Sequence, residues 1–151
     1  ILLQAPPGAG KTTRVPLALM DAPWREDRKI LMLEPRRLAA RSAARYMAGQ
    51  VGEKPGQTVG YRTRLDTRVT PATVIEVVTE GILTRLIQND PALEDYAVVI
   101  FDEFHVLLIH HKFWLSCQKR FTRVAVQLAY AWDNFRGSGR STAGLVVADS
   151  V

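Results

Sequence analysis

The stretch Ala5-Pro6-Pro7-Gly8-Ala9-Gly10-Lys11-Thr12 follows a short apolar run at residues 1–4, and it decides the fold. Its Pro and Gly residues cannot continue a strand, so the chain must turn there. Residues 11–20 suit a helix, which we expect Pro16 to kink. The octapeptide fits the phosphate-loop pattern G-x-x-x-x-G-K-[ST], except that Ala5 stands at the first Gly. A strand, this loop and a helix in that order predict a nucleotide-binding site.

The chemistry of a phosphate loop assigns a role to each part of this stretch. Backbone N–H groups surround the β-phosphate at the helix N-terminus, Lys11 reaches the β- and γ-phosphates, and the Thr12 hydroxyl binds Mg²⁺. The alternative is a Gly-rich turn with a solvent-facing lysine. The predicted nucleotide-binding residues are Ala5, Pro6, Pro7, Gly8, Ala9, Gly10, Lys11, Thr12 and Thr13.

Apolar runs alternate with helical patterns over the following 80 residues. Because apolar strands separated by helices are typical of a parallel sheet covered on both faces, the sequence predicts an α/β fold. We expect strands at residues 29–34, 58–64, 73–79 and 96–101, helices at 35–51 and 80–89, and turns at 52–56 and 66–71.

An acidic segment, Asp102-Glu103-Phe104-His105, follows the predicted strand at residues 96–101. In a parallel sheet, this strand end lies at the same edge as the phosphate loop. In a nucleotide hydrolase, Asp102 would hold Mg²⁺ and Glu103 would orient or deprotonate the attacking water. By itself such a segment is more often a solvated turn, and the upstream phosphate loop favours the functional interpretation.

Together these segments resemble the DEAH/DExH-box helicases of superfamily 2, and within them the bacterial HrpB group. Residues 5–13 resemble helicase motif I and residues 35–41 (PRRLAAR) resemble motif Ia. Residues 59–62 (VGYR) resemble the segment that follows motif Ia. Residues 79–83 (TEGIL) resemble motif Ib and residues 102–105 resemble motif II. Five segments in the family's order are more specific than any one of them, and the resemblance covers about residues 1–105.

The resemblance implies the first RecA-like lobe of an ATP-dependent RNA helicase, with ATP and Mg²⁺ as cofactors and RNA, or alternatively DNA, as partner. His105 would link the ATP site to the motions of the lobe. The implied catalytic residues are Lys11, Asp102, Glu103 and His105, and the Mg²⁺ ligands are Thr12, Asp102 and Glu103. The implied nucleic-acid contacts are Pro35, Arg36, Arg37, Thr79, Glu80 and Gly81. Arginine and the N–H groups of helix starts suit phosphate, so binding should tolerate any base sequence and weaken with salt.

One basic stripe on the second predicted helix has a different expectation. Arg37, Arg41 and Arg45 lie four residues apart and therefore share one helix face. For Arg41 and Arg45 we favour a solvated surface over contact with nucleic acid.

The last third of the chain departs from the family pattern. Residues 1–105 have 14 Lys or Arg and 13 Asp or Glu, whereas residues 106–151 have six and two. No Ser-Ala-Thr motif follows, and the second helicase lobe and its Gln/Arg motif are absent. We therefore expect an incomplete lobe at residues 1–105 and a divergent basic tail at 106–151, of partial helix or disorder.

A frame change in the gene is one explanation of this tail, because codons for Val106-Leu107-Leu108-Ile109 read one base earlier can encode Arg-Ser-Leu-Asn, close to the family's Glu-Arg-Ser. A second possibility is that aromatic and basic side chains interleave there for base stacking. A metal site from His105, His110, His111 and Cys117 matches no standard zinc spacing. Residues 137–144 (GSGRSTAG) resemble a flexible linker.

Composition narrows the class of protein. With 47% hydrophobic and 23% charged residues in 151, the chain is typical of a globular domain and excludes collagen and intrinsic disorder. Its single cysteine, Cys117, favours a reducing, cytoplasmic compartment. No uncharged run approaches the length of a transmembrane helix. Because the chain begins at Ile1 inside an apolar run, we expect it to be a fragment.

Two other classes of function remain open from the residues. A phosphate-loop kinase or another ATPase would need an acceptor site and would leave residues 35–41 and 79–83 unexplained. A non-enzymatic nucleic-acid-binding module, or an inert truncated product, would bind RNA or nothing without using Lys11.

Overall fold

The computed structural model describes residues 2–5, 9–102, 125–130 and 145–146, with side chains over residues 9–102. The helices are α1 (Lys11–Ala18), α2 (Arg37–Gln50) and α3 (Glu80–Asn89), with a 3₁₀ turn, η1 (Pro23–Arg25). The strands are β1 (Leu2–Ala5), β2 (Lys29–Leu33), β3 (Val59–Arg62), β4 (Thr67–Arg68), β5 (Ile75–Val78), β6 (Tyr96–Phe101), β7 (Ala125–Tyr130) and β8 (Leu145–Val146).

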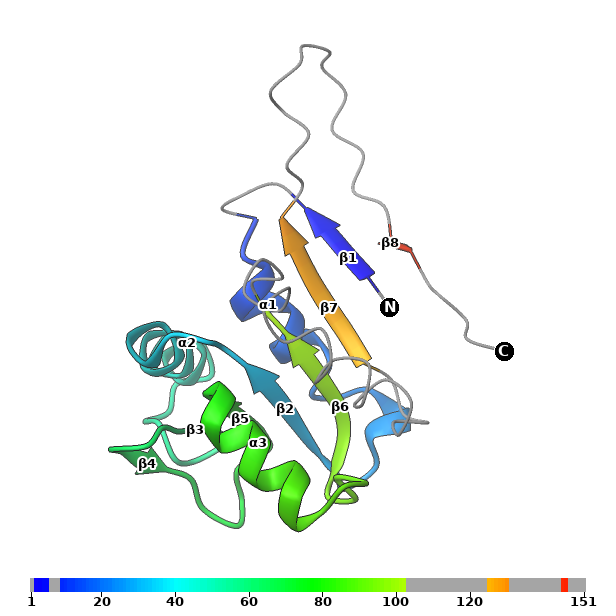
Figure 1. Ribbon diagram of the computed structural model, residues 1–151. Coiled ribbons are helices and arrows are strands. Elements are labelled where there is room, and N and C mark those ends of the chain that lie inside the picture. Colours follow the sequence, from blue (N-terminus) through cyan, green and yellow to red (C-terminus); the bar gives the residue numbers. More distant parts are fainter. Residues whose placement is uncertain (1, 6–8, 103–124, 131–144, 147–151) are drawn as a thin grey trace.

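These strands form one sheet in the order β4-β3-β5-β2-β6-β7-β1-β8 (Figure 1). All neighbouring pairs are parallel except β3 with β4 and β1 with β8, which are antiparallel. The expected α/β fold with a mainly parallel sheet is confirmed. The parallel strands β1, β2, β5 and β6 all end at one edge, so the segments that follow them meet there.

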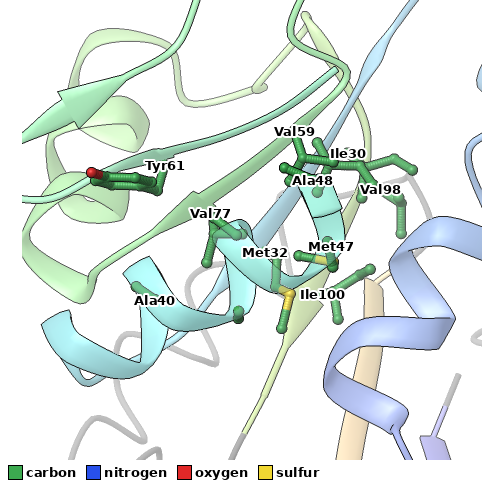
Figure 2. Close-up of a cluster of buried hydrophobic side chains, with 13 residues drawn as sticks. Ile30, Met32, Ala40, Met47, Ala48, Val59, Tyr61, Val77, Val98 and Ile100 are labelled. Atoms are coloured by element: carbon green, nitrogen blue, oxygen red, sulfur yellow. The ribbon is translucent and has the colours of Figure 1, made fainter. Parts of the chain in front are cut away.

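Two hydrophobic clusters cover the two faces of the sheet. On one face, Ile30 and Met32 of β2 and Ile100 of β6 pack against α2, with α1 beside them (Figure 2). Alanines and Met47 form the buried side of α2, so this helix approaches the sheet closely. On the other face, Leu31 and its neighbours pack against α3. Alternate residues of one strand thus face different helices, which is why the strands read as continuous apolar runs.

Several element bounds differ from the expected ones. The second helix begins at Arg37 rather than Pro35, because Arg36 has an extended backbone and acts as the N-cap whose carbonyl accepts the Ala40 N–H. The first helix ends at Ala18, and Pro16 is buried within it. Residues 67–68, expected to be part of a turn, pair with β3 as the short strand β4.

The expectation of helix or disorder in the tail was wrong for two segments. β7 pairs in parallel with both β6 and β1, and β8 pairs with β1. Residues 125–130 (AVQLAY) contain no charged side chain, which suits a strand between two others. The expected linker at 137–144, the four residues of the possible metal site and the Val106-Leu107-Leu108-Ile109 junction lie outside the described residues.

One acidic side chain lies inside the sheet. Glu76 of β5 is fully buried and accepts hydrogen bonds from Lys29 Nζ at 2.7 Å and from the Tyr96 hydroxyl at 3.1 Å. Arg62 Nε lies 3.0 Å from Oε2 of Glu76, the oxygen that also accepts from Tyr96. Burial, and then the charge of Glu76, raise the pKa of the Tyr96 hydroxyl. This network joins β2, β3, β5 and β6 across the face that α3 covers.

Candidate nucleotide and nucleic-acid site

A left-handed glycine precedes the start of α1. Gly10 is the N-cap and has a φ of 77°, a left-handed conformation that favours glycine. Its carbonyl accepts the Arg14 N–H at 2.7 Å, which begins the helix. No side chain caps the N-terminus of α1, so no cap competes for the N–H groups of its first turn. Such a helix N-terminus attracts phosphate groups.

Lys11 and Asp102 meet at this edge of the sheet. Lys11 begins α1 and is 6% exposed, while Asp102 directly follows β6 and is 2% exposed. Burial lowers the pKa of the Lys11 ammonium, and the carboxylate of Asp102 opposes that shift by Coulombic attraction. The cation of one motif and the carboxylate of the other therefore interact electrostatically, although 91 positions separate them in the chain.

The residues at this edge suit Mg²⁺. Thr12, in the first turn of α1, is half-buried, and Asp102 is buried. Mg²⁺ prefers oxygen ligands and is commonly held by one or two carboxylates together with phosphates and water. Within residues 9–102, no three His, Cys, Asp or Glu side chains gather as a metal cage. The donor set therefore fits this ion.

The predicted nucleic-acid contacts come from two helix starts on neighbouring strands. Arg36 and Arg37, at the start of α2, are exposed, and Pro35 beside them is half-buried. Thr79 is the extended N-cap of α3, and its hydroxyl caps no backbone group. Because β2 and β5 are adjacent and parallel, these two helix starts lie at one edge. Glu80, which is half-buried, and Gly81, which is exposed, complete the second segment.

The Arg41 side chain has a partner that its place in the basic stripe did not predict. Its guanidinium lies 3.6 Å from Asp66 Oδ2 and 6.0 Å from the centre of the Tyr61 ring. The Tyr61 hydroxyl donates to the same carboxylate at 2.6 Å. That hydrogen bond is the largest cause of a lowered pKa for Asp66, with Arg41 and Arg68 adding attraction. The Arg41 ion pair thus links α2 to the turn before β4, and Arg45 is exposed.

Glu34 was missed by the sequence interpretation. It directly follows β2 and is 2% exposed, in register with the position of Asp102 after β6. The only sequence signal was an acidic residue closing the apolar run at 29–34, which by itself indicates a solvated strand end.

Five of the predicted site residues lie outside the described part of the chain: Pro6, Pro7, Gly8, Glu103 and His105. For Ala5, the structure gives the backbone as the last residue of β1. Ala9 is exposed, and Thr13 donates to the Gly10 carbonyl at 3.4 Å. In the described helices, none is long and apolar enough to cross a membrane.

Comparisons with known proteins identify a family. The family model described as DEAD/DEAH box helicase matches residues 1–131. The chain is 56% identical over 105 residues to the ATP-dependent RNA helicase HrpB of Escherichia coli, which covers 70% of this chain and 13% of that protein. It is 34% identical over 123 residues to the ATP-dependent RNA helicase HrpA of Borreliella burgdorferi, which covers 82% of this chain and 15% of that protein.

Solved structures agree with the sequence relatives. The crystal structure of the E. coli DExH-box NTPase HrpB matches with a TM-score of 0.74 and 43% identity, over 89% of this chain and 17% of that one. The chain therefore spans less than a fifth of the length of these relatives. The structural match supports the expected RecA-like fold, now from the arrangement of the strands as well as from the motifs. This chain belongs to the DEAD/DEAH box helicase family.

Proposed function

We propose that this chain forms the nucleotide-binding part of the first RecA-like lobe of an ATP-dependent RNA helicase. The observation that supports this most is the buried pair of Lys11 and Asp102, which joins the phosphate loop to the acidic segment at one sheet edge. In this proposal Lys11 contacts the β- and γ-phosphates of ATP. Backbone N–H groups of the loop residues at 5–13 other than Pro6 and Pro7 surround the phosphates.

The same proposal assigns the metal and the water. Thr12 and Asp102 hold Mg²⁺, with Glu103 beside them, and the bound ion neutralises phosphate charge. Glu103 also orients the attacking water, and His105 connects the site to the motions of the lobe. Full hydrolysis and strand separation need two lobes that close on ATP, so we expect no duplex unwinding from these 151 residues alone.

RNA is the proposed partner of the two helix starts. Pro35, Arg36 and Arg37 contact one part of the phosphate backbone, and residues 79–81 contact another. The printed names of the relatives, which are RNA helicases, favour RNA over DNA. We propose residues 1–105 as the part that holds both sites, with residues 106–151 as a divergent basic segment, and a cytoplasmic location in line with one cysteine.

The experiment is a titration of a fluorescent, non-hydrolysable ATP analogue with Mg²⁺ into the purified chain, beside Lys11→Ala and the control Lys54→Ala. Lys54 is exposed and lies in the turn after α2. Binding that is lost in Lys11→Ala and kept in Lys54→Ala supports the proposal. Binding that survives Lys11→Ala, or no binding to the unchanged chain, contradicts it. RNA binding without any nucleotide binding would favour the non-enzymatic module instead.

A further inference from the structure

Glu34 occupies the strand end between the two proposed binding regions. Its N–H donates to the carbonyl of Val78 at 3.0 Å, so the β2 to β5 ladder continues through it. On the other side, the Asp102 N–H donates to the Leu33 carbonyl at 3.1 Å. Glu34 and Asp102 are therefore neighbours on adjacent parallel strands, each one residue beyond the register pair Leu33 and Phe101.

The alternation of side chains places both acids on one face of the sheet. Ile30 and Met32 of β2 face α1 and α2, and Val98 and Ile100 of β6 face the same way. Continuing that period of two, Glu34 and Asp102 fall on the face where α1 begins with Lys11. Both acids are only 2% exposed.

The carboxylate of Glu34 also contacts the first segment proposed to bind nucleic acid. Its Oε1 accepts the Arg36 N–H at 3.5 Å, a long hydrogen bond to the N-cap of α2. This contact lies where the chain passes from β2 into α2. The side chain is thus held at the edge of the sheet by a backbone donor rather than released into solvent.

We propose that Glu34 is a positioning residue of the nucleotide site, whose buried negative charge strengthens the dependence of nucleotide binding on Mg²⁺. This inference rests on the proposed function. A carboxylate in a poorly screened position one strand from Asp102 attracts a divalent cation bound there and repels the phosphates of a nucleotide without metal. The two effects have opposite sign, so removing the charge should weaken metal-loaded binding and improve metal-free binding.

A purely structural role for Glu34 predicts a different pattern. If the side chain only shaped the turn into α2, then its replacement would weaken nucleotide binding in the same direction with and without Mg²⁺. The ratio of the two dissociation constants separates these cases, because damage to the fold cancels in it to a first approximation.

The experiment uses Glu34→Gln, which keeps the shape and the acceptor oxygen and removes the charge. The non-hydrolysable ATP analogue is titrated into the unchanged chain and the variant, once with excess Mg²⁺ and once with EDTA. We expect the ratio of Kd in EDTA to Kd in Mg²⁺ to fall about tenfold. Electrostatic interactions between neighbouring charges in proteins are commonly of this size.

Glu53→Gln is the matched control. Glu53 is half-buried and, like Glu34, accepts a hydrogen bond from a backbone N–H, here that of Thr58 at 2.8 Å, but it lies in the turn after α2. Its ratio should stay within about twofold of the unchanged chain. Glu34→Asp keeps the charge and should keep the ratio. If Glu34→Gln does not fold, Glu34→Ser removes the charge in its place and should lower the ratio in the same direction.

The possible outcomes distinguish the role of the Glu34 charge from the proposed nucleotide binding itself. A ratio unchanged in Glu34→Gln, or one lost equally in Glu34→Asp, overturns the role of the Glu34 charge while the proposed nucleotide binding stands. No binding of the analogue to the unchanged chain overturns both.

Discussion

Lys29 Nζ lies 2.7 Å from Oε1 of Glu76, so a cation at the start of β2 partners a carboxylate that is fully buried in β5. The lysine side chain is 25% exposed, whereas the glutamate has no contact with water. This asymmetry matters because the cation can return to solvent when the pair is broken, but the carboxylate cannot.

Lys29→Met should therefore lower the free energy of unfolding by about 2 kcal/mol, because Glu76 loses a charged hydrogen-bond donor and retains Arg62 and Tyr96. Urea denaturation of both proteins measures the difference. Lys54→Met, at an exposed position, is the control and should change it by less than about 0.5 kcal/mol. A Lys29→Met chain as stable as the control would mean that Arg62 and Tyr96 are enough to compensate the buried acid.

Gly60 allows β3 to approach the end of β4 and the residue after it. A Cβ built on Gly60 would lie 2.3 Å from the carbonyl oxygen of Arg68 and 2.8 Å from Cγ1 of Val69. Gly60→Ala should therefore force backbone to move and destabilise the fold by about 1–3 kcal/mol. Gly49→Ala is the matched control in α2, where nothing lies within 4 Å, and it should stabilise by about 0.5–1 kcal/mol. In thermal unfolding, Gly60→Ala should lower the melting temperature of the chain and Gly49→Ala should raise it.

The Asp66 carboxylate should make stability depend on acid pH. The Tyr61 hydroxyl first, and then Arg41 and Arg68, lower the pKa of Asp66 in the folded chain. A lowered folded pKa contributes stability that is present above the unfolded value of about 3.9 and is lost as pH falls through the folded pKa. The stability difference between the unchanged chain and Asp66→Asn should therefore shrink below about pH 4.

An NMR titration gives a direct test of the same contact. In Tyr61→Phe, the carboxyl resonance of Asp66 should titrate at higher pH than in the unchanged chain, because the largest cause of the lowered pKa is removed. An unchanged midpoint would show that the arginines, rather than the tyrosine, hold the carboxylate ionised.

The charge of Asp102 should affect the pKa of the Lys11 ammonium at the proposed nucleotide site. Asp102 raises the pKa of Lys11 against the larger lowering that burial causes. Asp102→Asn should therefore lower the pKa of the Lys11 ammonium further, as followed by NMR of the lysine side chain. A Lys11 midpoint that does not move would contradict the electrostatic contact on which the proposed function depends.

RNA binding should separate the arginines at the start of α2 from those along it. If Arg36 and Arg37 contact phosphates, replacing each with Gln should reduce the slope of log K against log salt by about 0.7 for single-stranded RNA. Arg45→Gln, an exposed arginine on the same helix, is the control and should leave the slope unchanged. Equal loss in all three would indicate a diffuse basic surface.

The sequence by itself determined the order of the α-helices and the parallel strands from residue 1 to 102, but not the short elements η1 and β4. Apolar runs with period two and helical patterns with period 3.6 are local, so α3 (Glu80–Asn89) and β6 (Tyr96–Phe101) were predicted with their observed bounds. The motifs also named Lys11 and Asp102, because a phosphate loop and an acidic strand end are recognisable within a few residues of chain. Their proximity followed from the rule that parallel strands end at one edge.

Only the tertiary structure decided which strands are neighbours, and with that the surroundings of single residues. The position of Glu34 beside Asp102 depends on β2 pairing with β6 across more than 60 residues of chain, which no local pattern encodes. The same holds for Glu76, whose cations come from β2 and β3, and for β7, which pairs between β6 and β1. The physical reason is that burial and charge pairing depend on distances between strands, whereas sequence periodicity reports only which side of its own strand a residue occupies.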